Sequence, residues 1–189
     1  MRRVIRPYPV HYVKPWRLDD GMEILIRPIR PEDEPLMVRF HGTLSERSVY
    51  LRYFHLSSVD YRVSHERLRR ICFVDYDREI ALVAERTDPA TAEREILAVG
   101  RLARLPRTNE AEFAILIGDA FQHHGLGTEM LQRLVEIARA EKLTRVTADI
   151  LPENDHMLRV CKLLGFRLRY SMEERVIKAE LLLSETTRP

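Results

Sequence analysis

The segment Gln122-His123-His124-Gly125-Leu126-Gly127 decides the fold of this sequence. It follows an apolar run typical of a strand, Phe113 to Ile117, and precedes an amphipathic pattern that predicts a helix from near Thr128. The first N–H groups of a helix have no partner within the helix, and the helix dipole adds partial positive charge there. Glycines let the backbone come close to a bulky anion. A strand, a glycine turn and a helix together therefore predict a diphosphate site.

Two common phosphate-binding loops do not fit this turn. A dinucleotide fingerprint reads G-x-G-x-x-G, and here only Gly125 and Gly127 match it. A P-loop reads G-x-x-x-x-G-K-[ST], and no Lys-Ser or Lys-Thr pair stands in the turn. Taken alone, the glycine pair fits an ordinary strand-to-helix turn equally well, so the surrounding sequence has to decide.

The wider pattern has a recognisable order. Q-x-x-G-x-G at a helix start is followed by a strand, by Asn154 and by a short helix ending in Leu164-Gly165-Phe166. From Ala111 to Phe166 this resembles the GNAT superfamily of acyl-CoA-dependent N-acyltransferases. The resemblance implies that acetyl-CoA is the co-substrate, that the turn binds its pyrophosphate, and that no metal is needed. The implied cofactor-binding residues are Ile115, Leu116, Ile117, Gln122, His123, His124, Gly125, Leu126, Gly127, Thr128 and Asn154.

Three upstream segments narrow the resemblance to one branch of the superfamily: Gly21 to Asp33 (GMEILIRPIRPED), Leu44 to Phe54 (LSERSVYLRYF) and Val74 to Ala84 (VDYDREIALVA). That branch contains the protein lysine acetyltransferase domains that modify acyl-CoA synthetases, often fused behind a large synthetase-like region. The resemblance covers roughly residues 8 to 183. It implies an N-terminal arm or linker over residues 1–21, an acetyltransferase domain over 22–183 and a tail over 184–189.

Composition limits the class of protein. A chain of 189 residues with 45% hydrophobic and 32% charged residues is typical of one soluble globular domain. A net charge of +2 gives no reason to expect nucleic acid as a partner. No apolar run approaches the length of a membrane span. Two isolated cysteines, Cys72 and Cys161, and the adjacent pair His123 and His124 do not suggest a metal site, and reduced cysteines favour a cytoplasmic location.

Periodicity and capping residues predict a mixed α/β (α+β) fold. Pro7, Pro9 and Pro15 predict irregular structure up to residue 21. Ser45 and Ser64 are expected to cap helices that run to about Tyr53 and Phe73. The complete set predicts a mixed, mostly antiparallel sheet of about seven strands flanked by helices. Strands are expected over residues 23–27, 79–86, 96–104 and 111–117, then one before Asn154 and two at the end, with a first helix over 31–41.

Acetyl transfer to an amine needs a base, because an alkyl ammonium with a pKa of about 10.4 is mostly protonated at neutral pH. The resemblance implies that Glu112, in the context Ala111-Glu112-Phe113-Ala114, is this general base. It also implies that pantetheine runs back along the strand, bonded to the backbone of residues 115–117. The structural alternative for Glu112 is a surface ion pair at the end of a strand.

The sequence departs from the family pattern at Cys161. Many GNAT enzymes have a tyrosine there, four residues before the glycine of L-G-F, as general acid for the departing thiolate. We expect Cys161 to be a buried helix residue rather than an acyl-carrying nucleophile. For Asn154, helix capping is the structural alternative to cofactor contact, and both roles are compatible. The run containing Ser45, Arg47, Ser48, Tyr50 and Arg52 either covers the acceptor side or is capping chemistry with a solvated basic face.

The predicted function is direct transfer of an acetyl group from acetyl-CoA to a primary amine. The favoured acceptor is a protein lysine, and an acyl-CoA synthetase is the favoured protein partner. One alternative is acetylation of a small amine or amino acid. Another is a non-catalytic acetyl-CoA-binding regulatory module, which the missing tyrosine would suit. The sequence leaves the acceptor and the oligomeric state open, with a homodimer as one possible assembly.

Overall fold

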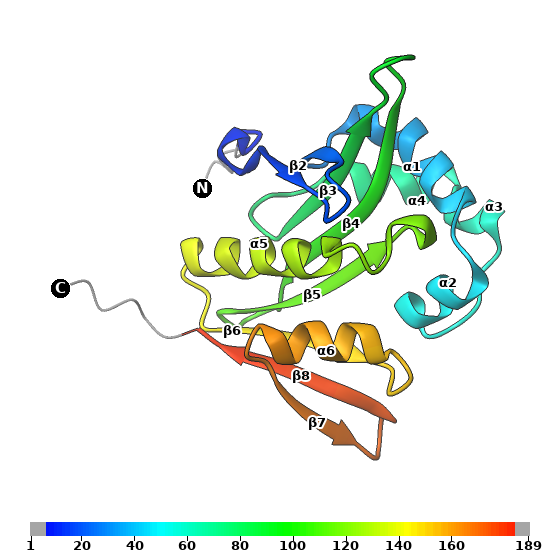
Figure 1. Ribbon diagram of the computed structural model, residues 1–189. Helices are drawn as coiled ribbons and strands as arrows, with labels where there is room; N and C mark the ends of the chain where they lie inside the picture. The colour runs from blue at the N-terminus through cyan, green and yellow to red at the C-terminus, as the bar shows by residue number, and fades with distance from the viewer. Residues whose placement is uncertain (1–6, 184–189) are drawn as a thin grey trace.

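An eight-stranded sheet runs through the molecule in the order β1-β2-β3-β4-β5-β6-β8-β7. The computed structural model describes residues 7–183 (Figure 1). Neighbouring strands are antiparallel except for β5 and β6, which are parallel. The strands are β1 (Lys14–Arg17), β2 (Glu23–Pro28), β3 (Glu79–Thr87), β4 (Arg94–Arg104), β5 (Glu110–Ile117), β6 (Arg145–Ile150), β7 (Arg167–Ser171) and β8 (Val176–Leu182).

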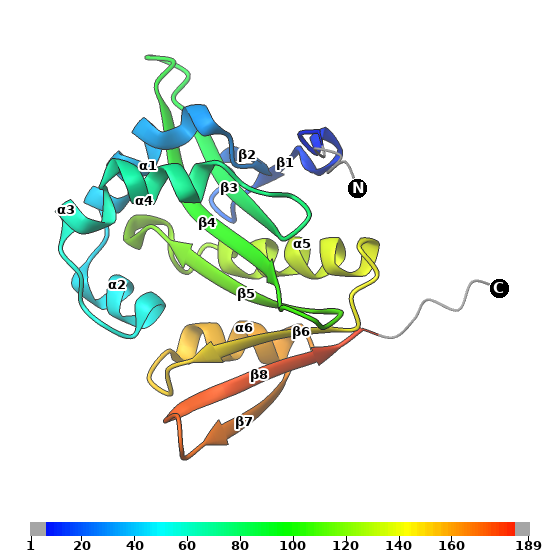
Figure 2. The ribbon, with the colours of Figure 1, turned by 180° about the vertical axis from the view of Figure 1, so that it is seen from behind.

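Helices cover both faces of this sheet. Helices α1 and α4 lie on one face, α5 and α6 lie on the other, and α2 lies beside the far end of β5 (Figures 1 and 2). The α-helices are α1 (Glu34–Gly42), α2 (Glu46–Tyr53), α3 (Val59–Arg62), α4 (His65–Cys72), α5 (Leu126–Ala140) and α6 (Asp155–Leu163). Short 3-10 helices occur at Val10–Tyr12, Pro31–Asp33 and Asp119–Phe121. Among the helices of residues 7–183, none combines the length and the apolar character of a membrane span.

Strand β5 contributes to two separate hydrophobic cores. Phe113 packs in the cluster beneath α5 and α6, together with Met130 of α5. Leu116 packs in the cluster beneath α1 and α4, together with Met37. Successive strand side chains point to opposite faces, so a strand covered on both faces is apolar along most of its length. This double burial holds β5, and the turn that follows it, in a fixed position.

Arg27 of β2 forms a buried ion cluster that fixes the start of α1. Its side chain is 1% exposed and makes two hydrogen bonds of 2.7 Å to the carboxylate of Asp33. Its Nε donates to Glu85 of β3 at 3.1 Å, and Asp33 also accepts from the backbone N–H of Arg30 at 2.8 Å. Breaking a buried charge pair leaves an uncompensated charge and costs about 3–5 kcal/mol. The cluster therefore holds the segment leading into α1 against the sheet.

The mixed, mostly antiparallel sheet flanked by helices is confirmed, but the N-terminal prediction was wrong in part. Residues 10–12 form a 3-10 helix and residues 14–17 form β1, so the sheet has eight strands rather than about seven. Pro15 is tolerated because β1 is an edge strand, which needs no N–H donor on its outer side. The boundary between an N-terminal arm and the domain at residue 21 stays a prediction. The predicted tail, 184–189, lies outside the described residues.

Two details of the helices also differ from expectation. Helix α5 begins at Leu126, two residues before the predicted start, because Gly125 at its N-cap adopts a left-handed conformation with φ of 79°. The single-turn helix α3 was not predicted. Ser45 caps α2 as expected, with its side chain accepting from the N–H of Ser48. Ser64 takes the N-cap position of α4, but its hydroxyl bonds to the carbonyl of Tyr61 instead.

Candidate active site

The turn between β5 and α5 presents unpaired backbone donors. The first intrahelical bond of α5 runs from the N–H of Glu129 to the carbonyl of Gly125. The N–H groups of Leu126, Gly127 and Thr128 therefore have no partner within the helix. No side chain of residues 7–183 caps this helix start. A helix of 15 residues that begins without a cap offers its donors and its dipole to an anion.

Gln122 belongs to a hydrogen-bond network rather than standing free. Its side-chain amide donates to Ser48 Oγ at 3.0 Å and to the carbonyl of Ile117 at 3.2 Å. Asp119 accepts from the hydroxyls of Ser45 and Ser48, at 2.5 and 2.9 Å. Burial acts to raise the pKa of Asp119, but these hydrogen bonds lower it overall, so its carboxylate stays charged. The network fixes the turn against α2.

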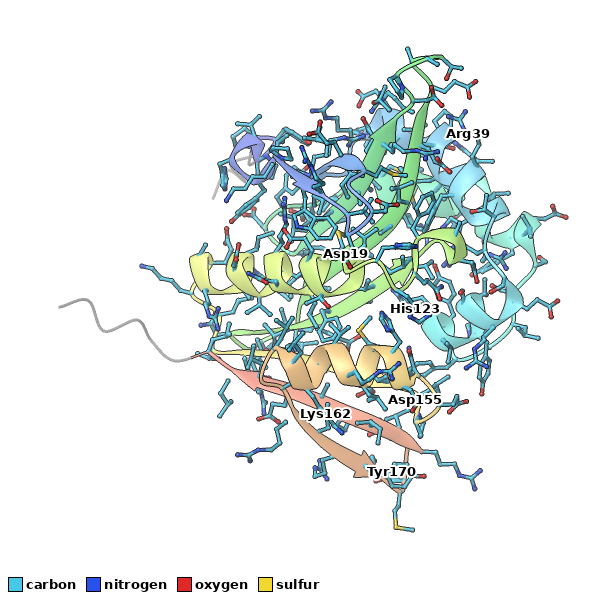
Figure 3. All side chains as sticks on the ribbon, viewed as in Figure 1. Asp19, Arg39, His123, Asp155, Lys162 and Tyr170 are labelled. Atoms are coloured by element: carbon cyan, nitrogen blue, oxygen red, sulfur yellow. The ribbon has the colours of Figure 1, made fainter. Side chains whose placement is uncertain are left out.

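The two histidines of the turn have different surroundings. The ring of His123, which is labelled in Figure 3, contacts that of His156 edge to face. The two ring centres are 4.7 Å apart. Burial, followed by His123 and Arg159, lowers the pKa of His156. His124 is half-buried. Sequence reasoning missed His156, which has only its place two residues after Asn154 to mark it. Residues 7–183 contain no group of three His, Cys, Asp or Glu residues that could hold a metal ion.

The cleft of the site lies where β5 and β6 separate. These strands pair only over Glu110–Glu112 and Arg145–Thr147. Beyond this point a cavity of about 290 Å³ extends toward the glycine turn. An adjoining cavity of about 270 Å³ includes Glu112. Both are lined by Leu51, Arg52, Ile115, Asn154 and Met157, so they form the two halves of one cleft. We name these the turn half and the Glu112 half.

The strand register decides which backbone groups of β5 face the cleft. The N–H of Gly118 donates to the carbonyl of Leu97 in β4. In an antiparallel ladder, every second residue bonds to the same neighbour. By this alternation the N–H and C=O groups of Leu116 point to β4, whereas those of Ile115 and Ile117 point to the cleft. Leu116 still lines the turn half. The cleft therefore offers strand-like hydrogen bonds to an extended ligand.

Glu112 lies at the point where the two strands part. It is the last residue of β5 that pairs with β6, opposite Thr147, and it lines the Glu112 half of the cleft. Its side chain is exposed. Among residues 7–183 its carboxylate has neither a hydrogen bond nor an ion pair. The surface ion pair considered for this residue is absent from that part of the chain, so the carboxylate is available to a bound group.

Asn154 and Cys161 belong to α6. The side chain of Asn154 accepts from the N–H of Met157 at 3.3 Å, which is the capping bond, and it lines both halves of the cleft. Cys161 is fully buried, and burial raises the pKa of its thiol to about 12. A protonated thiol in the core cannot carry an acyl group. The expectation of a buried helix residue is confirmed.

Comparison with known proteins agrees with this architecture. The family model of the acetyltransferase (GNAT) domain matches residues 23–167. The chain therefore belongs to the GNAT acetyltransferase family, whose members use acetyl-CoA as the acyl donor.

Three relatives illustrate this membership. The GNAT domain of S. lividans PAT is 28% identical, with a TM-score of 0.82 over 94% of this chain and 100% of that chain. An acetyltransferase of Pseudomonas aeruginosa is 28% identical over 156 residues, 82% of this chain and 80% of its own length. RimJ of Mycobacterium smegmatis, in complex with CoA-disulfide, is 15% identical with a TM-score of 0.72 over 93% and 89%. The RimJ structure shows the same fold.

Proposed function

We propose that this protein transfers the acetyl group of acetyl-CoA directly to a lysine side chain of a protein, such as an acyl-CoA synthetase. One observation supports this more than any other. A single cleft runs from Gln122 and His123, in the turn before the uncapped start of α5, to the free carboxylate of Glu112. From Ile117 to Glu112 is about 17 Å of strand at roughly 3.3 Å per residue. An extended arm such as pantetheine suits this separation.

The turn would hold the diphosphate, and β5 would hold the arm. Donors at Leu126, Gly127 and Thr128 suit the diphosphate. Amide groups along pantetheine can bond to Ile115 and Ile117 as a neighbouring strand would. His123 and Asn154 line the same cleft, and His124 follows His123 in the turn, while Gln122 keeps the turn in place through Ser48. One backbone N–H that points into the cleft would polarise the thioester carbonyl.

Glu112 would act as the general base. It removes a proton from the lysine ammonium, directly or through water, and the neutral amine attacks the thioester carbon. The new C–N bond forms, the C–S bond breaks, and coenzyme A leaves. Cys161 cannot supply a proton, because it is buried in the core. Tyr170, the next tyrosine after Cys161 in the sequence, lies on β7 at the sheet edge (Figure 3). Coenzyme A would therefore leave as the thiolate or with a proton from water.

Exposed apolar side chains beside the Glu112 half favour a protein acceptor. Phe54 lines that half and is 39% exposed. Leu56 and Tyr61, on the segment that follows α2, are 62% and 58% exposed. Grouped exposed apolar side chains mark surfaces that contact other proteins. Similarity to the GNAT domain of PAT supports the same choice.

The test is to follow thiol release from acetyl-CoA with a folded acyl-CoA synthetase, lysine peptides, polyamines and free amino acids. Glu112→Gln is expected to lower kcat by about 10²- to 10⁴-fold, with calorimetric affinity for coenzyme A unchanged. Glu110→Gln is the matched control. Glu110 lies two residues before Glu112 on the same strand, and its carboxylate forms an ion pair with Arg145.

Three results would contradict the proposal. Full activity of Glu112→Gln would remove this residue as the base. Transfer to small amines alone would indicate a small-molecule acetyltransferase. Tight cofactor binding without transfer to any acceptor would indicate a regulatory module.

A further inference from the structure

Arg52 borders the Glu112 half of the cleft, and two further arginines, Arg67 and Arg101, lie close to it on neighbouring elements. Arg52 lies on the last turn of α2 and lines both halves of the cleft. Arg67 of α4 lies behind it, and both guanidinium carbons are close to the ring centre of Tyr53, at 4.9 and 5.1 Å. Tyr53 is thus in contact with two cations. We call Arg52, Arg67 and Arg101 the arginine group.

The charges of the arginine group are only partly balanced. Arg101 lies on β4 opposite Ala114 and forms an ion pair with Glu79. Within residues 7–183 neither Arg52 nor Arg67 forms an ion pair, and Nε of Arg67 is buried without a hydrogen-bond partner. Burial, with Arg52 as the largest electrostatic contribution, lowers the pKa of Arg101 to about 10. Burial also lowers the pKa of Arg52, although Tyr53 and Glu112 act to raise it. Arg52 and Arg67 therefore each lack an ion-paired carboxylate within residues 7–183, and this is the counter-charge that a ligand would supply.

The cofactor does not provide that counter-charge. In the proposed pose its diphosphate binds at the turn, and its acyl end, at Glu112, carries no charge. A cation that faces the acyl end therefore has to match something on the acceptor. The same cavity of about 270 Å³ holds one free carboxylate, Glu112, and one free guanidinium, Arg52. This pair complements an acceptor with an ammonium group and an anionic group close together.

We propose, building on the acetyltransferase function above, that the acceptor carries a carboxylate next to the amine that is acetylated. Arg52 binds this carboxylate through charge-assisted hydrogen bonds, and Arg67 and Arg101 strengthen the positive field behind it. Glu112 faces the ammonium group. The carboxylate comes either from an acidic side chain beside the target lysine of a protein or from the α-carboxylate of a free amino acid. Both sources present the same chemistry to Arg52.

Matched acceptor pairs test the inference. The first pair is a lysine peptide with glutamate beside the lysine and the same peptide with glutamine. The second pair is free lysine and lysinamide, with acetylation of the α-amine as the readout, because only this amine lies next to the α-carboxylate. The acidic member of at least one pair is expected to have a KM lower by about 10- to 100-fold, as for a hydrogen bond between charged groups. A preference confined to the peptides identifies a protein side chain, and one confined to free lysine identifies an amino acid.

Variants assign the preference to Arg52. Arg52→Gln is expected to reduce the KM ratio between neutral and acidic acceptors to less than about twofold. Arg52→Lys is expected to restore part of that ratio. Arg69→Gln is the matched control, because Arg69 is exposed on α4, lies over the ring of Phe73 and lines neither half of the cleft. It removes the same charge and should keep the preference. Thermal unfolding of each variant shows that it is folded.

Equal KM values within both pairs would overturn the inference while leaving the acetyltransferase function intact. The inference would also be overturned if Arg52→Gln raised the KM of acidic and neutral acceptors equally. If no acceptor were acetylated, the proposed function would fail separately. Calorimetry with the same peptide and lysine pairs in the presence of coenzyme A would still decide the inference, because equal Kd values within both pairs would exclude it.

Discussion

The side-chain amide of Gln122 donates a hydrogen bond of 3.0 Å to the hydroxyl of Ser48, which lies 74 positions earlier in the sequence. This bond joins the glycine turn to α2, and the same amide also bonds to the carbonyl of Ile117. The turn that would hold the diphosphate and the helix that carries Arg52 are therefore connected by one side chain. A substitution at Gln122 should therefore affect binding at both ends of the cleft.

A double-mutant cycle measures this connection. Gln122→Ala and Ser48→Ala should each raise the KM for acetyl-CoA, and the double variant should be less impaired than the sum by about 0.5–1.5 kcal/mol. Steady-state kinetics with varied acetyl-CoA give the four values. Gln132→Ala is the control, since Gln132 bonds to Glu136 on the exposed side of α5. Strict additivity would mean that the bond does not couple turn and helix.

A substitution at Gly127 should weaken cofactor binding without destabilising the fold. A Cβ at this position would meet only His156 Nε2, at an ordinary 3.7 Å. Gly127→Ala should therefore leave the free energy of unfolding equal to the wild type or higher by up to about 1 kcal/mol, because alanine favours a helix. Calorimetry should show weaker coenzyme A binding, because the methyl group stands where the diphosphate approaches. Unchanged affinity would remove Gly127 from the cofactor site.

Gly125 should behave differently. Its φ of 79° is unfavourable for any residue with a Cβ, and a Cβ there would lie 3.3 Å from the carboxylate of Asp19 (Figure 3). We expect Gly125→Ala to lose about 1–2 kcal/mol of unfolding free energy in urea denaturation. A variant as stable as the wild type would contradict the left-handed geometry.

Cys161 should prove dispensable for chemistry. Its thiol is buried, with a pKa raised to about 12, and lies in the core formed with Phe166 and Ala179. Cys161→Ala should keep kcat within about twofold and lose about 1 kcal/mol of stability through the small cavity. Mass spectrometry of enzyme mixed with acetyl-CoA should show no acetylated Cys161. An acetylated thiol, or loss of turnover, would instead support Cys161 as an acyl-carrying nucleophile.

Acid should destabilise the fold through His41. This side chain is 1% exposed, and neither ring nitrogen has a hydrogen-bond partner within residues 7–183. Burial, then Arg62, Arg67 and Arg52, lower its pKa from 6.5 to about 4. The unfolded chain therefore binds a proton more readily than the folded one. Stability is present above pH 6.5 and is lost as the pH falls toward 4.

The measurement is the free energy of unfolding against pH, by urea denaturation. Between about pH 7.5 and about pH 5 the His41 contribution should fall by about 2 kcal/mol. His41→Leu, which has no ring nitrogens to leave unsatisfied, should show a pH dependence shallower by that amount. Equal slopes for the two proteins would show that His41 titrates normally.

Local signals in the sequence predicted much of this structure. Ser45 and Asn154 stand at helix starts and make the capping bonds expected of them, because a cap depends on residues within one turn. The parallel pair of β5 and β6 agrees with the mixed, mostly antiparallel sheet that was predicted. The edge strand β1 was missed, because closely spaced prolines look irregular unless the neighbouring strand is known. The early start of α5 was missed because the φ of Gly125 is not visible in its neighbours.

The sequence by itself determined the alternation of strands and helices, the uncapped glycine turn and the family to which the chain belongs, because these depend on short-range geometry and residue order. Only the tertiary structure brought Ser48 to Gln122, and Arg52 and Glu112 to the walls of one cavity. Those contacts join segments dozens of residues apart, and they depend on how both faces of the sheet are packed. Side-chain packing, rather than any local pattern, therefore placed the guanidinium of Arg52 and the carboxylate of Glu112 in the same cavity.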